Sequence, residues 1–345
     1  RPGEIIDRLG AKGEELVQAV AGSANDIFEL IDKYNIDCDS GQNGWFQPAG
    51  SKQALKKMEE DAKIWRSIGA KVSMLDSVET QINTGVSGYF GSCKSDTGGV
   101  LHPVKFVQGV VSSAISRGLS YFSNTSVVSY RYVDKKWQLV TDKGILLSEK
   151  ILICTNAQSK ELTPDVYKSV IPMLICHAAT NPIPVDQRQH LLKAGQAMTD
   201  TRSNLFSYRF DRDYRLITGA IPVINVDGGR RLAGRLGRRL ADELNLPECP
   251  KIEFSWLGVA SITQDFFPRV FDIGPNGYAV TACNGRGLAL SVLWARRVAS
   301  MIKRDSFDDP ILDIVKPKYL KRRIPAILGT RLYPITAHIK DYFDR

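Results

Sequence analysis

The 345-residue sequence has no hydrophobic run long enough to cross a membrane, because every 18-residue stretch contains charged residues. No signal peptide is recognisable, and the chain begins with Arg1 and not with Met. Internal repeats, low-complexity tracts and Pro/Gly/Ser-rich linkers are absent as well. With 43% apolar and 9% aromatic residues spread throughout, the composition excludes a disordered chain and favours a globular protein of about two domains.

The sequence is also poor in residues that carry metal or hydrolytic chemistry. Its six cysteines form no CxxC pair and have no histidine at metal-ligand spacing. We expect them to be reduced and mostly buried, as is typical of a cytoplasmic protein, and we predict no metal site. Only four histidines are present, without a Ser/His/Asp arrangement or a pair of carboxylates at helical spacing.

Positive charge is in excess, with a net charge of +9 and a pI of about 9.2. The surplus is concentrated in residues 209–240 and 316–345. Neither stretch interleaves aromatic with basic residues as a nucleic-acid groove does. A solvated basic surface, or a field that attracts an anionic ligand, is therefore favoured over nucleic-acid binding, which remains the weakest alternative.

Three amphipathic helices are predicted in the first third of the chain. Apolar spacing indicates a helix within residues 4–34 and another over residues 51–68, with Ser51 as the N-cap. A third helix is predicted to begin at Pro103, where a missing N–H costs nothing, and to end at Gly118. It is expected to turn four side chains inward: Val107, Val110, Val111 and Ala114.

The pattern then changes to strands. Alternating residues predict a hairpin over residues 126–141, followed by a strand over 145–147 and a second hairpin over 205–218. Ile151–Cys154 is apolar at every position, which favours a strand covered on both faces in a parallel sheet. The strand ends in Thr155-Asn156-Ala157, which is typical of the ligand edge of an open α/β sheet. The predicted fold class is α/β or mixed α+β with a mixed sheet.

One segment carries a chemical signal of its own. A strand ending at Val280-Thr281 runs through Asn284-Gly285-Arg286-Gly287 into a helix that begins at Leu288. Glycines allow close approach of a ligand, and unpaired N–H groups at a helix start stabilise an anion. The alternative is a tight strand–helix connection whose glycines serve only its geometry.

The order of these pieces resembles one known family. The sequence is similar to the D-amino-acid oxidase superfamily of FAD-dependent enzymes in a set of features that occur in the same order. They are the hairpin, the strand ending in Thr-Asn-Ala, Trp256-x-Gly258, Thr263-x-Asp265-x-x-Pro268 and Asn284–Gly287 before a helix. Within it, the gamma-glutamylputrescine oxidoreductase subgroup is the most similar. The matching segments span roughly residues 30–305.

The resemblance implies a Rossmann-like FAD-binding domain interleaved with a mixed-sheet substrate domain. The family's opening βαβ unit with its GxGxxG turn has no counterpart here, so we expect an N-terminally incomplete FAD domain that retains FAD poorly by itself. The implied division assigns residues 1–38, 104–165 and 256–308 to the FAD-binding domain, 39–103 and 166–255 to the substrate domain, and 309–345 to a basic C-terminal tail.

The implied activity is oxidation of an amine or amino acid, such as a gamma-glutamyl polyamine, to an imine by hydride transfer to FAD. No cysteine occurs over residues 259–264, where some relatives tether the flavin, so noncovalent FAD is expected. The implied partners are a small amine and either a missing N-terminal segment or a second copy, without a membrane or nucleic acid. A flavoprotein-derived subunit without activity of its own is the alternative function.

The resemblance also assigns residues. Backbone N–H groups are expected to contact the reduced flavin at Asn284, Gly285, Arg286, Gly287 and Leu288, whereas the adenine side is assigned to Val127, Val128, Thr155, Asn156 and Ala157. The catalytic candidates are Tyr89, His102 and Trp256, and the substrate-binding candidates are Tyr208 and Arg209. For His102 a capping role, for Trp256 a packing role and for Arg209 a solvent-facing role remain the alternatives, and His177 is expected in the core.

Overall fold

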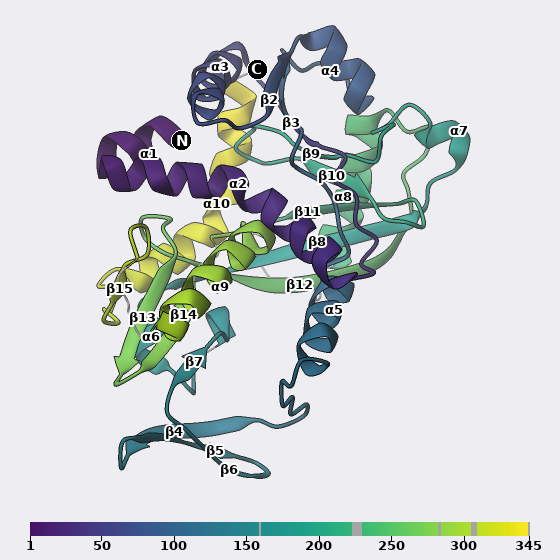
Figure 1. The fold of residues 1–345 in the computed structure, drawn as a ribbon. Helices are drawn as coiled ribbons and strands as arrows, with labels where there is room; N and C mark the ends of the chain where they lie inside the picture. The colour runs from purple at the N-terminus through teal and green to yellow at the C-terminus, as the bar shows by residue number, and fades with distance from the viewer. Residues whose placement is uncertain (159, 223–229, 282–283, 305–308, 344–345) are drawn as a thin grey trace. The chain divides into compact units, whose positions relative to one another are not determined.

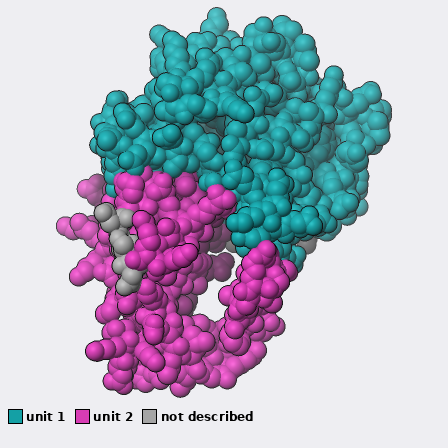
Figure 2. Space-filling view, in the orientation of Figure 1, with its two compact units in different colours: residues 1–110, 174–258, 330–345 teal, residues 111–173, 259–329 magenta. Residues whose placement is uncertain are grey.

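The computed structural model describes every residue except 159, 223–229, 282–283, 305–308 and 344–345 (Figure 1). The chain divides into two compact units (Figure 2). The first contains residues 1–110, 174–258 and 330–345, and the second contains residues 111–173 and 259–329. Helices and mixed sheets occur in both units, which confirms the predicted fold class.

An eight-stranded mixed sheet organises the first unit. Its strands lie in the order β12 (Ile252–Ile262), β8 (Ile171–Pro182), β11 (Arg215–Ala220), β10 (Ser207–Phe210), β9 (Ala197–Thr199), β1 (Trp45–Pro48), β3 (Ser92–Ser95) and β2 (Val72–Leu75). β10 and β11 form the predicted hairpin, with Arg209 opposite Ile217. One face of this hairpin carries Tyr208 and Leu216 into the core, so Arg209 belongs to the opposite face.

The helices follow the sequence pattern with one break. The helices of the first unit are α1 (Pro2–Leu9), α2 (Ala11–Tyr34), α3 (Lys52–Ser67), α4 (Ser77–Thr84), α7 (Val185–Arg188) and α8 (Arg230–Leu244), while α5 (Pro103–Ile115) and α10 (Arg323–Phe343) continue from one unit into the other. The single helix predicted within residues 4–34 is wrong, because Gly10 adopts a φ of 58° and separates α1 from α2.

The predicted cap of α3 is confirmed. The Ser51 hydroxyl accepts a hydrogen bond from the backbone N–H of Ala54, at 3.2 Å. It therefore satisfies one of the N–H groups that a helix start leaves unpaired.

Ser51→Ala is expected to lower the free energy of unfolding by about 1 kcal/mol, because that N–H loses its acceptor. Equilibrium urea unfolding measures the change. Ser67→Ala at the other end of α3 is the matched control, since the Ser67 hydroxyl only donates to the Ile64 carbonyl, and we expect it to stay within about 0.5 kcal/mol. Equal losses in both variants would contradict the capping argument.

The start of α5 at Pro103 is as predicted, and of the four side chains expected to point inward only Val107 is exposed. Val107 is 56% exposed, whereas its neighbour Phe106 is buried. The other three, Val110, Val111 and Ala114, are half-buried.

The second unit contains two smaller sheets. The predicted hairpin and its third strand form a meander of β4 (Val127–Val133), β5 (Lys136–Thr141) and β6 (Gly144–Ser148). The other sheet has the order β15 (Ile314–Val315), β13 (Arg269–Gly274), β14 (Gly277–Thr281) and β7 (Ile151–Ile153). The remaining elements are the helices α6 (Pro164–Lys168) and α9 (Gly287–Arg304) and the 3₁₀ helix η1 (Asn156–Gln158).

β7 is parallel to β14, as the sequence indicated. Its side chains nevertheless alternate, because Ile151 and Ile153 are buried while Leu152 is 42% exposed. The prediction that this strand is covered on both faces is therefore wrong within the described residues. β7 lies at the end of its sheet order, where only one neighbouring strand pairs with it.

The division into units groups residues 1–38 with residues 39–103, whereas the sequence-based division assigned them to different domains. The functional assignment of the domains stays a prediction.

Among the described cysteines all are free, with Cys38, Cys93 and Cys176 buried and Cys154 and Cys249 exposed, and Cys283 lies outside the described residues. No described helix is both long and apolar enough to span a bilayer.

Candidate functional site

Two parallel strands of the second unit end at the same sheet edge. β7 leads into Thr155 and the 3₁₀ turn Asn156–Gln158, and β14 leads towards the glycine turn at 284–287. Both Asn156 and Asn284 adopt left-handed φ values, 50° in each case. The carboxyl edge of a parallel pair followed by a helix start is where open α/β sheets bind ligands, so the predicted flavin segments lie at a suitable edge.

A hydrogen-bond cluster fixes this edge. The Asn284 side-chain oxygen accepts from the backbone N–H of Thr263 at 2.9 Å, and the Thr281 hydroxyl pairs with the Ser261 hydroxyl at 2.9 Å. The Asn284 backbone N–H donates to the Ser261 carbonyl at 3.2 Å. The expectation that this N–H contacts flavin is therefore wrong in this structure, because the N–H already has an acceptor and the residue is buried.

The next three residues fit the flavin prediction better. Among the described residues, none accepts a hydrogen bond from the backbone N–H of Gly285, Arg286 or Gly287. Gly285 has a φ of 78° and open space where a Cβ would project. α9 begins at Gly287, so its unpaired N–H groups and the positive end of its dipole lie at the turn. This arrangement suits the negative charge of a reduced isoalloxazine ring.

The remaining cofactor candidates differ in accessibility. Val128 is 64% exposed on β4, whereas Val127 is half-buried and lies beside a register shift in the β4–β5 ladder. Thr155 is exposed at the end of β7, and Ala157 is buried within the 3₁₀ turn. Leu288 is 38% exposed in the first turn of α9, so its side chain is not part of the core. Their contacts with FAD stay predictions.

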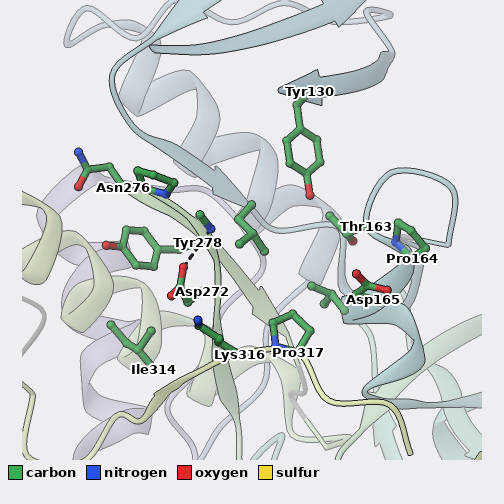
Figure 3. A pocket seen from close by; sticks show the side chains of 14 residues that line it. Tyr130, Thr163, Pro164, Asp165, Asp272, Asn276, Tyr278, Ile314, Lys316 and Pro317 are labelled. Atoms are coloured by element: carbon green, nitrogen blue, oxygen red, sulfur yellow. Dashed lines mark hydrogen bonds between the residues drawn. The ribbon is translucent and has the colours of Figure 1, made fainter. Parts of the chain in front are cut away.

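A cavity of about 880 Å³ occupies the opposite end of the same strands (Figure 3). It is lined by the β13–β14 turn at Gly274–Asn276 and by Tyr130, Asp165, Asp272 and Lys316. β14 begins after this turn and β7 runs parallel to it, so the glycine turn that follows β14 lies at the other edge of the sheet. We therefore separate this cavity from the predicted flavin position.

The first unit contains a larger cavity of about 1060 Å³. Three of the residues predicted from the sequence, His102, Arg209 and Trp256, line it. Arg188 and Tyr214 also line it, and the sequence analysis did not identify either residue. The rare left-handed φ of Tyr214, 60°, could not be anticipated from the residue type.

Arg209 has the most distinctive environment in this cavity. Burial lowers the pKa of its guanidinium, and none of the described residues makes a hydrogen bond or an ion pair with it. The side chain is half-buried, so its guanidinium is available to a carboxylate of a ligand that enters the cavity. This environment favours a role in the cavity for Arg209 over the solvent-facing alternative, and that role stays a prediction.

Arg209 also affects a neighbouring aromatic pair. The rings of His177 and Trp256 stack with centroids 5.6 Å apart and planes inclined by 17°. His177 is half-buried, so its expected place in the core is wrong. Burial and the Arg209 charge lower the pKa of His177 below its usual 6.5. The neutral imidazole is therefore favoured next to Trp256, which lines the cavity.

A pH dependence of stability follows from His177. Its folded-state pKa is lowered, so the unfolded chain binds more protons, and stability decreases as the pH falls below about 6.5. His177→Gln is expected to reduce the loss of unfolding free energy between pH 7.5 and pH 5.5, measured by urea unfolding at each pH. His190→Gln at an exposed position is the control, and an unchanged loss in His177→Gln would refute the assignment.

His102 caps α5. Its backbone carbonyl accepts from Phe106 N–H at 3.0 Å, and its Nδ1 accepts from Lys105 N–H at 3.4 Å. The nearby Lys105 ammonium donates to Asp39 at 2.7 Å, and this contact holds the pKa of the Asp39 carboxyl below its usual value. The capping alternative for His102 is therefore realised, and its imidazole still borders the cavity.

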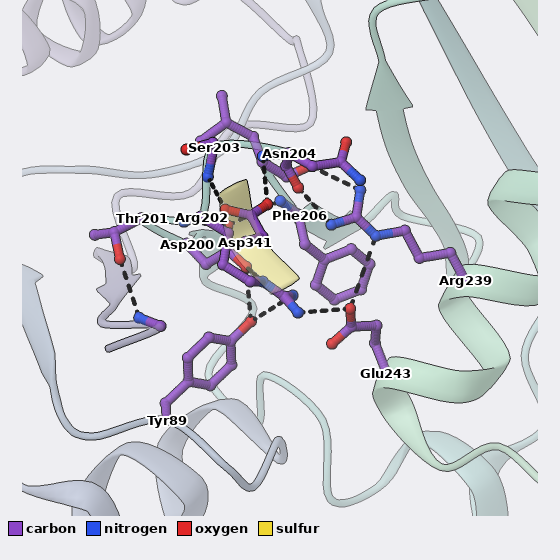
Figure 4. Close-up of polar contacts among 12 residues, drawn as sticks. Tyr89, Asp200, Thr201, Arg202, Ser203, Asn204, Phe206, Arg239, Glu243 and Asp341 are labelled. Atoms are coloured by element: carbon purple, nitrogen blue, oxygen red, sulfur yellow. Dashed lines mark hydrogen bonds and ion pairs between the residues drawn. The ribbon is translucent and has the colours of Figure 1, made fainter. Parts of the chain in front are cut away.

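Tyr89 does not line the cavity. Its hydroxyl donates to Asp200 at 3.0 Å and accepts from Arg202 at 3.1 Å, inside a buried polar network (Figure 4). Arg202 also pairs with Asp200 and, at 2.8 Å, with Glu243. Asp341 near the end of α10 accepts from the backbone N–H groups of Ser203 and Asn204, both at 2.7 Å. The geometry therefore gives Tyr89 a structural role, in contrast to its predicted catalytic one.

Tyr208 is also separated from the cavity. It is 1% exposed, and its hydroxyl donates to the Thr84 carbonyl at 2.6 Å. The alternation of side chains along β10 directs Tyr208 and Arg209 to opposite faces. The two predicted substrate-binding residues therefore cannot act on the same face, and only Arg209 borders the cavity.

Comparison with known proteins identifies the family. The family model described as FAD dependent oxidoreductase matches residues 3–301, so the chain belongs to this family of FAD-dependent oxidoreductases. Over 336 residues the chain is 23% identical to "Probable oxidoreductase OrdL" of Haemophilus influenzae, covering 95% of this chain and 75% of that protein. It is 24% identical over 286 residues to gamma-glutamylputrescine oxidoreductase of Escherichia coli, covering 81% and 66%.

Solved structures support the same fold. L-proline dehydrogenase from P. horikoshii aligns with a TM-score of 0.73 at 14% identity, covering 85% of this chain and 80% of that one. Glycine oxidase from Geobacillus kaustophilus aligns with a TM-score of 0.69 at 18% identity, covering 88% and 82%. The family match confirms the predicted resemblance to the D-amino-acid oxidase superfamily, and the solved structures show that the fold is that of these flavoenzymes.

Proposed function

We propose that this protein oxidises an amine that carries a carboxylate, namely an amino acid or a gamma-glutamyl polyamine, to an imine that water then hydrolyses. The observation that carries the proposal is Arg209, a half-buried guanidinium that borders a cavity and has no acceptor among the described residues. A guanidinium binds a carboxylate through two parallel hydrogen bonds, which fixes both the position and the orientation of the substrate.

The cavity supplies the other requirements of amine oxidation. The C–N bond is oxidised as a hydride leaves the α-carbon and the nitrogen loses a proton, so the substrate amine must be neutral when it reacts. His177, with its lowered pKa, adds no positive charge at neutral pH that would oppose binding of a protonated amine. The stacked His177–Trp256 pair provides a flat wall, with Trp256 bordering the cavity.

Noncovalently bound FAD, when present, supplies the hydride acceptor. The residues for its redox ring are Gly285, Arg286 and Gly287, whose backbone N–H groups have no described acceptor. Gamma-glutamylputrescine oxidoreductase and glycine oxidase, whose names state amine and amino-acid substrates, are relatives in sequence and in fold. These similarities support the choice of an amine over other reduced substrates.

Product formation tests the proposal. The protein, with free FAD in excess, is incubated with a panel of amino acids and amines, with oxygen and a redox dye supplied in parallel as acceptors. For at least one carboxylate-bearing amine we expect a carbonyl product and the released amine or ammonia in equal amounts. If FAD binds but no member of the panel gives product with either acceptor, the alternative of a subunit without activity is favoured.

A further inference from the structure

The large cavity of the first unit has more positive charge than its own residues neutralise. Among the described residues, three carboxylates line it, Asp39, Asp211 and Asp213, against six cations: Lys105, Arg188, Lys193, Arg209, Arg212 and Arg215. Ion pairs with these carboxylates account for half of the cations. Asp39 pairs with Lys105 and Arg212, at 2.7 and 3.0 Å, and Asp213 and Asp211 both pair with Arg215.

The cations left over include two guanidinium groups and the exposed Lys193. Arg188 donates from Nε to the Ile183 carbonyl at 3.0 Å, and its guanidinium carbon lies 3.5 Å from the centroid of the Tyr214 ring. Its two Nη atoms have no acceptor among the residues described here. Stacking on an aromatic face fixes a guanidinium plane while leaving its edge free for a carboxylate.

Backbone hydrogen bonds fix the position of Tyr214, on whose ring Arg188 stacks. Its φ of 60° is unfavourable for a bulky residue, so surrounding contacts must maintain it. Its carbonyl accepts from Ile183 N–H at 2.9 Å, and its N–H donates to the Asp211 carbonyl at 3.1 Å. The Asp211 carboxylate accepts from the N–H groups of Asp213 and Arg215, which fixes the rest of the turn.

The two free guanidinium groups start from separate places on the cavity wall. Arg209 lies opposite Ile217 in the β10–β11 ladder, and Tyr214 lies three residues before Ile217, at the turn. Three residues of fully extended chain span roughly 10 Å, so the backbone positions of Arg209 and Tyr214 are separated along the hairpin by at most about that length. They are thus suited to two carboxylates of one ligand.

We infer that the substrate carries two carboxylates, with Arg209 binding one and the Arg188–Tyr214 stack binding the other. The substrate class is therefore an amino or imino dicarboxylic acid, or an amine with an acidic group remote from the carboxylate held by Arg209. This inference rests on the proposed function for the identity of the reaction, but the binding of two carboxylates does not depend on turnover.

Binding of inert acids is the direct test. Calorimetric titration of the protein compares succinate, glutarate and adipate with butyrate, which has a single carboxylate. At least one diacid is expected to bind about 10-fold or more tightly than butyrate. Arg188→Gln is expected to remove this preference and Arg188→Lys to keep part of it, because lysine retains the positive charge but lacks the paired N–H donors of the guanidinium. Arg238→Gln, an exposed position on α8 outside the cavity, is the matched control.

Turnover provides a second measurement. With FAD present, kcat/KM for glutamate or iminodiacetate is expected to exceed that for the matched analogue with a single carboxylate, glutamine or sarcosine, by about 100-fold, and Arg188→Gln is expected to reduce this ratio. Equal binding of butyrate and all diacids, or a diacid preference that survives Arg188→Gln with the fold intact by circular dichroism, would overturn the inference. Diacid binding without any turnover would instead count against the proposed oxidation alone.

Discussion

Replacing Arg209 with methionine is expected to lower kcat/KM for carboxylate-bearing amines by roughly 100- to 1000-fold. Methionine keeps much of the aliphatic part of the side chain but removes the guanidinium that would bind the substrate carboxylate. Truncating one partner of a hydrogen-bonded charge pair typically costs about 2–5 kcal/mol, or roughly 30- to 5000-fold, and the expected loss lies within these limits. Steady-state kinetics with the best substrate of the panel measure the loss.

Two comparisons separate carboxylate binding from general damage. Arg238→Met on the exposed face of α8 is expected to leave kcat/KM unchanged, since it does not border the cavity. An amine that lacks the carboxylate is expected to lose little activity when Arg209 is replaced. A loss of equal size for substrates with and without the carboxylate would show that Arg209 supports the cavity and does not recognise the acid.

Replacing Arg202 with methionine is expected to lower the free energy of unfolding by about 3–5 kcal/mol, because Asp200 then keeps a buried charge without its cation. Asp200 is fully buried, and burial raises the pKa of its carboxyl. Arg202 contacts Asp200, Glu243 and the Tyr89 hydroxyl, so its removal also affects the neighbours in Figure 4. Urea unfolding followed by tryptophan fluorescence gives the change.

The matched control is an exposed pair. Lys168 lies 4.0 Å from Asp165, and both side chains are more than half exposed. Lys168→Met is expected to change stability by less than about 1 kcal/mol, since water already solvates both charges. The combined Asp200→Asn, Arg202→Met variant is expected to be more stable than Arg202→Met alone. A loss in Arg202→Met no larger than in Lys168→Met would contradict the buried-pair argument.

Local patterns were predictable from the sequence because short-range physics determines them. The Ser51 cap, the start of α5 at Pro103 and both hairpins depend on residues within a few positions of one another. The break at Gly10 was missed because a glycine in a polar helical stretch is compatible with continuation of the helix, and only the observed φ of 58° shows the interruption.

The site was predictable only in part. Family resemblance located Arg209, Trp256 and the glycine turn, but which face of a strand borders a cavity depends on the sheet register and the packing. Tyr208 and Arg209 are adjacent in sequence, but Tyr208 is buried in the core and only Arg209 borders the cavity. Tyr89 lies in a buried polar network and does not border the cavity. Arg188 belongs to no recognisable sequence motif. Its stacking on Tyr214 is a contact between separate elements of the fold, which the local sequence does not indicate.

The most direct measurement is the visible absorbance of protein-bound FAD after anaerobic addition of the substrate amine in a stopped-flow instrument. We expect the oxidised flavin band to bleach in a single turnover, with a rate that saturates with amine concentration and an apparent affinity that weakens in Arg209→Met. Full retention of the oxidised band with every carboxylate-bearing amine, while dithionite still reduces the same bound flavin, would contradict the account.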